Sequence, residues 1–200
     1  MLFQERGRYC FMICKNGKAL FLIVFFFIAA CRPNDKLQQL KAEVVAFERQ
    51  QIVIPSGLVC VKSGQVLSEW GLEDIPHFVY YFDSTECVGC RLQHVINLSP
   101  LFQEDSYGEK YDVIPIFAPK VEDRDKILQE AKYALHDYSL YLDLDGRFLK
   151  ENPRMPSDSR FHCFLLNREG NPIFVGDPAA NPKMRRLFSK IEKRLPKRNK

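Results

Sequence analysis

Short apolar runs alternate along the chain with segments in which apolar residues recur at helical spacing. The runs are rich in β-branched and aromatic residues, which predicts strands at 77–83, 112–118, 139–142, 161–166 and 172–175. Recurrence at i, i+3 and i+4 predicts helices at 35–51, from Cys87 onward, at 121–136 and from Pro182. This alternation predicts an α/β fold with right-handed crossovers and a largely parallel sheet, to which the final hairpin adds an antiparallel edge.

The first part of the chain predicts an extension ahead of this alternation. The helix at 35–51 is followed by short extended pieces at 52–54, 58–61 and 65–67, with turn residues between them. We expect these pieces to form a hairpin on the edge of the sheet.

Two of the later helices have apolar stripes that should face the core. In the helix at 121–136 the stripe consists of Val121, Ile127, Leu128, Ala131 and Leu135. In the last helix, which Asn181 should cap, it consists of Met184, Leu187, Phe188, Ile191 and Leu195. Residues 143–147 contain part of a Ca²⁺-loop pattern without its remaining ligands, so we expect a turn there.

The N-terminus has the pattern of an export signal. A basic stretch from Arg6 to Lys18 precedes twelve apolar residues, 19–30, which are too few to span about 30 Å of hydrocarbon. The sequence Ile28-Ala29-Ala30-Cys31 resembles a bacterial lipobox, which implies that Cys31 becomes the first mature residue and carries a lipid. We therefore expect a lipoprotein signal peptide at 1–30, a tether at 31–36 and a folded domain at 37–200. An uncleaved anchor or an ordinary signal peptide is the alternative.

Charge gives no indication of a nucleic-acid partner. The net charge is +4, and residues 1–30 account for +3 of it through Arg6, Arg8, Lys15 and Lys18 against Glu5. Residues 31–200 therefore carry only +1, which excludes the strongly basic surface typical of nucleic-acid binding.

The seven cysteines fall into three groups. Cys10 and Cys14 belong to the signal segment, and Cys31 is the lipidation candidate. Cys60 and Cys163 lie in apolar strand-like runs and are interpreted as buried, inert thiols, although the sequence leaves open whether they pair with each other. Cys87 and Cys90 form a Cys-x-x-Cys pair.

The Cys-x-x-Cys pair follows the strand at 77–83 and a turn of Asp83, Ser84 and Thr85. It therefore lies at a helix N-terminus, where unpaired N–H groups and the helix dipole favour a thiolate. We interpret it as a thiol–disulfide redox site in which Cys87 is the nucleophile. Cys90, one turn further on and facing inward, would resolve the mixed disulfide. Glu86 opposes a thiolate on Cys87, whereas Arg91 favours it.

These motifs resemble the thioredoxin superfamily. Cys87-Val-Gly-Cys90 after Tyr80-Tyr-Phe-Asp83 looks like its active-site turn, and Phe164-Leu-Leu-Asn-Arg-Glu-Gly170 looks like the hairpin of its redoxin and TlpA-type branch. With Cys31, 155–158 and 176–182, the chain is similar to uncharacterised thioredoxin-like lipoproteins of gut Gram-negative bacteria, over about residues 40–195.

The resemblance implies a thioredoxin-like fold with a central mixed sheet flanked by helices. It also implies a membrane-anchored oxidoreductase that faces the periplasm from the inner or outer membrane and acts on exported thiol- or disulfide-bearing proteins. The sequence departs from the family pattern in three places: Glu86 replaces the usual Trp, Val-Gly lies between the cysteines, and Phe161 or His162 falls where a cis-proline is usual.

Other functions were weighed against this one. The rival hypothesis is a non-catalytic thioredoxin-fold lipoprotein, a binding or structural module with a stable Cys87–Cys90 disulfide. A peroxidase motif is half matched by Ser84 three residues before Cys87, but Tyr80 replaces its proline. A zinc site lacks two further ligands, and a copper site would need His162. The other histidines, His77, His94 and His136, are scattered, and we predict neither a metal nor a cofactor.

Overall fold

The computed structural model describes residues 35–62, 65–85, 89–91, 93–95, 109–134 and 139–197. Residues 39–200 cluster into one compact unit, apart from a unit at 1–38 of which only residues 35–38 are described. The predicted signal segment, the lipid site Cys31 and the nucleophile Cys87 therefore lie outside the described residues. In the described part, no helix combines the length and the apolar character needed to cross a membrane.

The described strands form one mixed sheet in the order β2-β1-β5-β4-β3-β6-β7. Their bounds are Val59–Lys62 for β1, Gln65–Leu67 for β2, His77–Phe82 for β3, Asp112–Phe117 for β4, Leu140–Leu142 for β5, Cys163–Leu166 for β6 and Pro172–Val175 for β7. Only β3–β4 and β4–β5 pair in parallel, and the other neighbours are antiparallel. The prediction of a largely parallel sheet was wrong, because β1 enters antiparallel to β5 and β6 antiparallel to β3.

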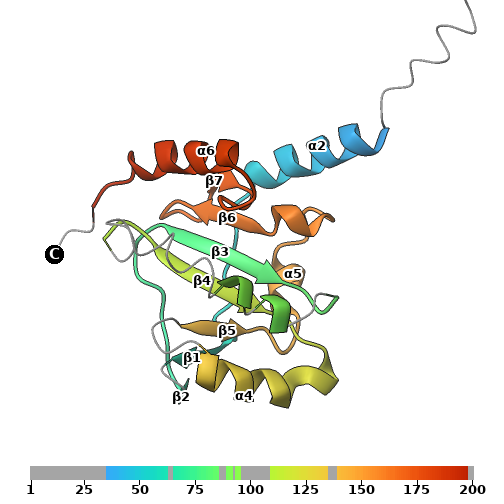
Figure 1. Ribbon diagram of the computed structural model, residues 1–200, viewed down its shortest axis with the longest axis vertical. Helices are drawn as coiled ribbons and strands as arrows, with labels where there is room; N and C mark the ends of the chain where they lie inside the picture. The colour runs from blue at the N-terminus through green and yellow to red at the C-terminus, as the bar shows by residue number, and fades with distance from the viewer. Residues whose placement is uncertain are drawn as a thin grey trace, which may run out of the picture. The chain divides into compact units, whose positions relative to one another are not determined.

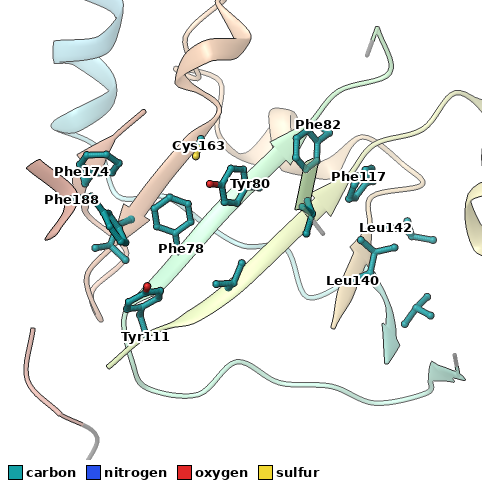
Figure 2. Close-up of a cluster of buried hydrophobic side chains, with 14 of the residues drawn as sticks. Phe78, Tyr80, Phe82, Tyr111, Phe117, Leu140, Leu142, Cys163, Phe174 and Phe188 are labelled. Atoms are coloured by element: carbon teal, nitrogen blue, oxygen red, sulfur yellow. The ribbon is translucent and has the colours of Figure 1, made fainter. Parts of the chain in front are cut away.

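The central strand β3 lies between β4 and β6, and all six of its residues are buried (Figure 1). Alternate side chains of a strand point to opposite faces, so β3 contributes to two separate cores. Phe78, Tyr80 and Phe82 belong to the core on one face (Figure 2), and Val79 and Tyr81 belong to the other. A strand buried on both faces reads as an unbroken apolar run, and this run is what predicted β3.

Helices cover both faces of the sheet. On the face of Figure 2, α4 (Arg124–Ala134) contributes Ile127 and α6 (Pro182–Glu192) contributes Phe188. On the opposite face, α2 (Asp35–Glu48) contributes Phe47 and α5 (Arg147–Glu151) contributes Phe148. The Phe47 ring packs edge-on against Phe164 with 5.0 Å between centroids, which fixes α2 on the sheet.

Among the described residues, two side chains that we predicted to face the core are exposed. Val121 is 72% exposed, because it belongs to a 3₁₀ turn, η1 (Val121–Asp123), and the angular period of α4 does not extend to it. Leu187 is 47% exposed, since Phe188 faces the core and neighbouring helical residues point about 100° apart. The capping prediction for α6 is confirmed, because the Asn181 side chain accepts hydrogen bonds from the N–H groups of Lys183 and Met184.

The extended piece at 52–54 does not become a strand. Its backbone pairs with the Asn152 side chain, which accepts from Val53 N at 2.9 Å and donates to Val53 O at 2.7 Å. Asn152 is only 1% exposed, so one side chain replaces a ladder partner here. The predicted edge hairpin is confirmed one segment later, as β1 and β2.

The predicted turn at 143–147 leads directly into α5, which the sequence analysis missed. The buried Asp143 carboxylate accepts hydrogen bonds from Arg147 N and Phe148 N, both at 2.8 Å. These two N–H groups open the helix and have no intrahelical acceptor. Gly146 takes a left-handed conformation, φ 64°, which makes the turn tight enough for the carboxylate to reach them.

Replacing this carboxylate should destabilise the protein. We expect Asp143→Ala to lower the free energy of unfolding by about 1–2 kcal/mol, because it removes the cap from the N–H groups of Arg147 and Phe148, the second of which is buried. Asp145→Ala is the matched control, since Asp145 is exposed and should change stability by less than about 0.5 kcal/mol. Urea unfolding of both variants measures the difference, and equal losses would contradict the assigned capping role.

Candidate thiol redox site

The segment after β3 begins with a turn that the Asp83 side chain closes. The Asp83 carboxylate accepts hydrogen bonds from both the backbone N–H and the hydroxyl of Thr85. Residues 89–91 and 93–95 are helical. The strand, turn and helix therefore follow in the predicted order, with Cys90 in the helical part.

Cys90 is exposed, which corrects the prediction that it faces inward. The helix is oriented by Val95, which is 5% exposed and packs in the core shown in Figure 2. Five helical residues rotate the chain by about 500°, so Cys90 points about 140° away from Val95. Its thiol is consequently accessible to a large partner.

The residue after Cys90 lies closer to the sheet. The Arg91 guanidinium carbon lies 5.8 Å from the centroid of the Phe82 ring, a cation–π contact at the end of β3. His94, one helical turn after Cys90 on the same face, places Nε2 3.3 Å from the Asp177 carboxylate. The helix that carries Cys90 is thus held to β3 and to the loop after β7.

A pocket of about 210 Å³ borders this helix. Its floor consists of buried β3 and β6 residues, and its rim comes from the helix, from the segment before β6 and from the loop after β7. The lining residues are Tyr80, Tyr81, Phe82, Arg91, His94, Ser159, Arg160, His162, Cys163, Asp177 and Ala180. The pocket is smaller than the roughly 300–1,000 Å³ of typical small-molecule sites, and its size suits one side chain of a partner.

Asp177 joins the helix to the far wall of the pocket. Burial alone would raise the pKa of its carboxyl, but the hydrogen bonds from His94 and from Ala179 N, with the charges of His94 and Arg91, lower that pKa overall. Asp177 is therefore a carboxylate at neutral pH. On the rim, exposed Arg160 makes a fork-like pair with Asp158, with Nε within 3.0 Å of both carboxylate oxygens.

His162 occupies the position directly before β6. Its backbone carbonyl accepts from Tyr81 N at 2.9 Å, which fixes it against β3. Its Nε2 lies 2.8 Å from Pro156 O, and because a carbonyl only accepts, this nitrogen carries the proton. In the neutral ring Nδ1 is then an acceptor, and this buried atom has no hydrogen-bond partner in the described structure.

The sequence offered Phe161 and His162 for the position where the family has a proline, and these two residues lie in different environments in the structure. Phe161 ends a 3₁₀ turn, η2 (Ser159–Phe161), while His162 follows it and is only 6% exposed. His162 is therefore the residue that lines the pocket next to β6. None of the described peptide bonds is cis.

The other two described thiols are buried. Tyr80 and Cys163 are partners across β3 and β6, both line the pocket, and both belong to the core shown in Figure 2. Burial raises the pKa of the Cys163 thiol well above its usual value. Burial likewise raises the pKa of the Cys60 thiol. Both cysteines thus match the prediction of inert thiols.

A disulfide between Cys60 and Cys163, which the sequence left open, is excluded. Cys60 belongs to one core and Cys163 to the other, on opposite faces of the sheet. Their strands β1 and β6 are also separated by β5, β4 and β3, a distance of about 19 Å. A disulfide needs Cα atoms within about 7 Å of each other.

The metal hypothesis gains nothing from the described residues, among which no three His, Cys, Asp or Glu side chains are grouped to hold an ion. His162 and His94 line the pocket, His77 lies at the opposite end of β3, and His136 lies outside the described residues.

The sequence analysis did not identify Asp177 as a residue of this site. The hairpin topology could have found it, because β7 runs parallel to β3 and both end at this edge.

Comparisons with solved structures found chains to which this one is similar at low sequence identity. The chain is similar to an uncharacterised thioredoxin-like protein from Porphyromonas gingivalis (16% identity, TM-score 0.47), covering 73% of this chain and 94% of that one. It is also similar to an exposed lipoprotein thioredoxin from Streptococcus pneumoniae (13% identity, TM-score 0.41, 60% and 85% covered). A third neighbour is a peroxiredoxin-like protein from Aquifex aeolicus (13% identity, TM-score 0.42, 72% and 85% covered). No protein-family model matches the sequence, and no curated protein matches it.

The fold is thioredoxin-like. Its central strands run β4-β3-β6-β7, β3 leads into the helix that carries Cys90, and α6 follows β7. This confirms the predicted fold class. The redox activity of the Cys-x-x-Cys pair is a separate question.

The His94–Asp177 contact should make stability depend on pH. Asp177→Asn keeps an acceptor for Ala179 N but removes the charge, so we expect a loss of about 0.5 kcal/mol at pH 6. Because the folded-state pKa of Asp177 lies below its usual value of 3.8, its contribution is present above about pH 4 and disappears as the pH falls through the folded-state pKa.

Urea unfolding of the wild type, Asp177→Asn, His94→Gln and the double variant at pH 6 and pH 3 measures this coupling. The interaction energy should be present at pH 6 and smaller at pH 3, because lowering the pH toward the folded-state pKa of Asp177 protonates its carboxylate. A deficit of the same size at both pH values would mean that the charge of Asp177 is not responsible.

Proposed function

We propose that the protein is a membrane-anchored thiol–disulfide oxidoreductase in which Cys87 is the nucleophile and Cys90 the resolving cysteine. The supporting observation is that Cys90 is exposed on the helix that follows β3, beside a pocket at the same edge of the sheet. The other two described cysteines are buried, so exchange is assigned to the Cys-x-x-Cys pair.

The exchange proceeds in two balanced steps. The Cys87 thiolate attacks one sulfur of a partner disulfide, forming a mixed disulfide and releasing the other partner sulfur as a thiolate, which takes up a proton. The Cys90 thiolate then attacks the Cys87 sulfur, forming Cys87–Cys90 and releasing the second partner thiol. The partner disulfide is reduced by two electrons, and the dithiol of the pair is oxidised; the reverse sequence oxidises a partner dithiol.

The exposure of Cys90 should affect the rate of the second step, the attack of Cys90 on the Cys87 sulfur. A resolving thiol must reach the Cys87 sulfur while the partner is still attached, and exposure leaves it free of steric obstruction from the core. The resolving step should therefore be fast, and mixed disulfides should accumulate only when Cys90 is removed.

The pocket would receive the partner chain next to its cysteine. Arg91, Arg160 and Asp177 line it, and Asp158 pairs with Arg160 beside it. These charges balance, so recognition relies on shape and hydrogen bonding rather than on net charge. Nδ1 of His162 is the buried acceptor there, and a donor from the partner, such as a backbone N–H, would satisfy it.

The location follows from the N-terminal sequence. A lipid on Cys31 would hold the domain at the periplasmic side of the inner or outer membrane, where disulfides form and persist. The partners proposed are therefore exported proteins that carry thiols or disulfides.

Partner trapping tests this function. In Cys90→Ser the second step is blocked, so we expect Cys87 to retain periplasmic proteins as mixed disulfides that reductant releases. The readout is non-reducing electrophoresis and mass spectrometry of complexes isolated from cells after acid quenching.

Cys87→Ser/Cys90→Ser is the matched control and should trap nothing. If Cys90→Ser also traps nothing above this control, turnover is absent, and the rival reading, a scaffold with a stable Cys87–Cys90 disulfide, is supported instead.

A further inference from the structure

A second pocket lies at the end of the sheet opposite to Cys90, where β3 begins and β6 ends. It has a volume of about 380 Å³, within the range of small-molecule sites. Three separate segments form it: the stretch after α2, the loop before β3 and the turn between β6 and β7. None of the predicted site residues lies in it, and the proposed redox function does not use it.

The walls of this pocket are held in place by the fold. The backbone N–H of Ile52 donates to Gly170 O at 2.8 Å, and Gln51 Nε2 donates to Glu169 O at 2.7 Å. Gly170 has φ +81°, and a Cβ there would lie 2.8 Å from Ile52 O, so only glycine permits this close approach. The stretch after α2 and the β6–β7 turn therefore form one preformed wall.

Apolar side chains and one histidine form part of the pocket lining. Ile52 is 4% exposed and Leu166 2%, and both contribute hydrocarbon surface. His77, the first residue of β3, is 8% exposed, and its Nε2 is buried without a hydrogen-bond partner in the described structure. A buried polar atom without a partner is costly, and a ligand that hydrogen-bonds to it removes the cost.

The rim of the pocket is negatively charged. Glu73, Asp74, Glu169 and Arg168 are the charged residues of its lining, a balance of −2 at neutral pH. Burial lowers the pKa of His77 to about 4, even though the charges of Glu73 and Asp74 act to raise it. The ring is therefore neutral at pH 7, and in the tautomer that carries its proton on Nδ1 the Nε2 atom accepts a hydrogen bond from a cation without repelling it.

We propose that this pocket binds a primary alkylammonium group, with the aliphatic stem on Ile52 and Leu166, the ammonium between the carboxylates, and an N–H donated to His77. An organic cation fits better than an inorganic one, because no His, Cys, Asp or Glu side chains among the described residues are grouped to hold a metal ion, and Ile52 and Leu166 offer apolar contact to an aliphatic stem. The same chemistry occurs in a free polyamine and in a lysine side chain of a partner protein.

The probe for the test is 1,5-diaminopentane, titrated into the full-length protein at pH 7 while the imidazole signals of His77 are followed by NMR. We expect saturable shifts of His77, with a dissociation constant on the order of 1 mM for so small a ligand. 1-Pentanol and pentanoate, which have the same stem without the positive charge, should bind at least about fivefold more weakly.

Variants assign the contacts. Asp74→Asn/Glu169→Gln should weaken binding by about three- to tenfold, whereas Glu151→Gln, which removes a charge outside the pocket, should leave it unchanged. His77→Phe keeps an aromatic ring at this position and removes the acceptor nitrogen, so it should also weaken binding. The amide signals of Gly170 report the binding in this variant. Thermal melts confirm that each variant is folded.

Equal binding of pentanol and the diamine, the absence of a saturable His77 shift, or unchanged affinity in Asp74→Asn/Glu169→Gln would each overturn the proposal. Titration with Nα-acetyl-lysine methylamide distinguishes the sources. Binding comparable to that of the diamine identifies a lysine-docking site, and binding of the diamine alone identifies a polyamine site.

Discussion

The burial of β3 on both faces is the constraint on which the rest of the structure depends. All six residues from His77 to Phe82 are buried, so helices must cover both faces of the sheet. Phe188 of α6 packs against Phe78 of β3, and Phe47 of α2 packs against Phe164 of the neighbouring strand β6. The helix that carries Cys90 follows one end of β3, and the carboxylate-rimmed pocket lies at the other.

The thiols differ in environment in a way that assigns their roles. Cys60 and Cys163 lie within the two cores, where burial raises the pKa of each thiol and keeps it protonated. Cys90 lies on the exposed side of its helix. A thiolate is the reactive form, so the same fold suppresses reaction at the core cysteines and leaves the Cys90 thiol accessible.

The sequence predicted what depends on periodicity and missed what depends on contacts between distant segments. The strands β3, β4, β6 and β7 and the cap of α6 follow from local patterns, and each was predicted within about two residues. The capping of α5 by Asp143 and the clamp of Asn152 on residues 52–54 join positions whose neighbours are not visible in a linear pattern. The inward orientation assigned to Cys90 was wrong for a related reason, because the rotation of the helix is set by where Val95 packs. Asp177 enters the site only through the strand order, since β7 and β3 end at the same edge.

The central claim concerns reversible electron exchange at Cys87 and Cys90. Its most direct measurement is equilibration of the purified full-length protein in glutathione buffers of graded potential, followed by alkylation and peptide mass mapping of each cysteine. The account predicts one reversible two-electron transition between dithiol and disulfide confined to the Cys87–Cys90 peptide, while Cys60 and Cys163 remain thiols throughout. A pair that stays oxidised across the whole range, or a transition that includes Cys163, would contradict it.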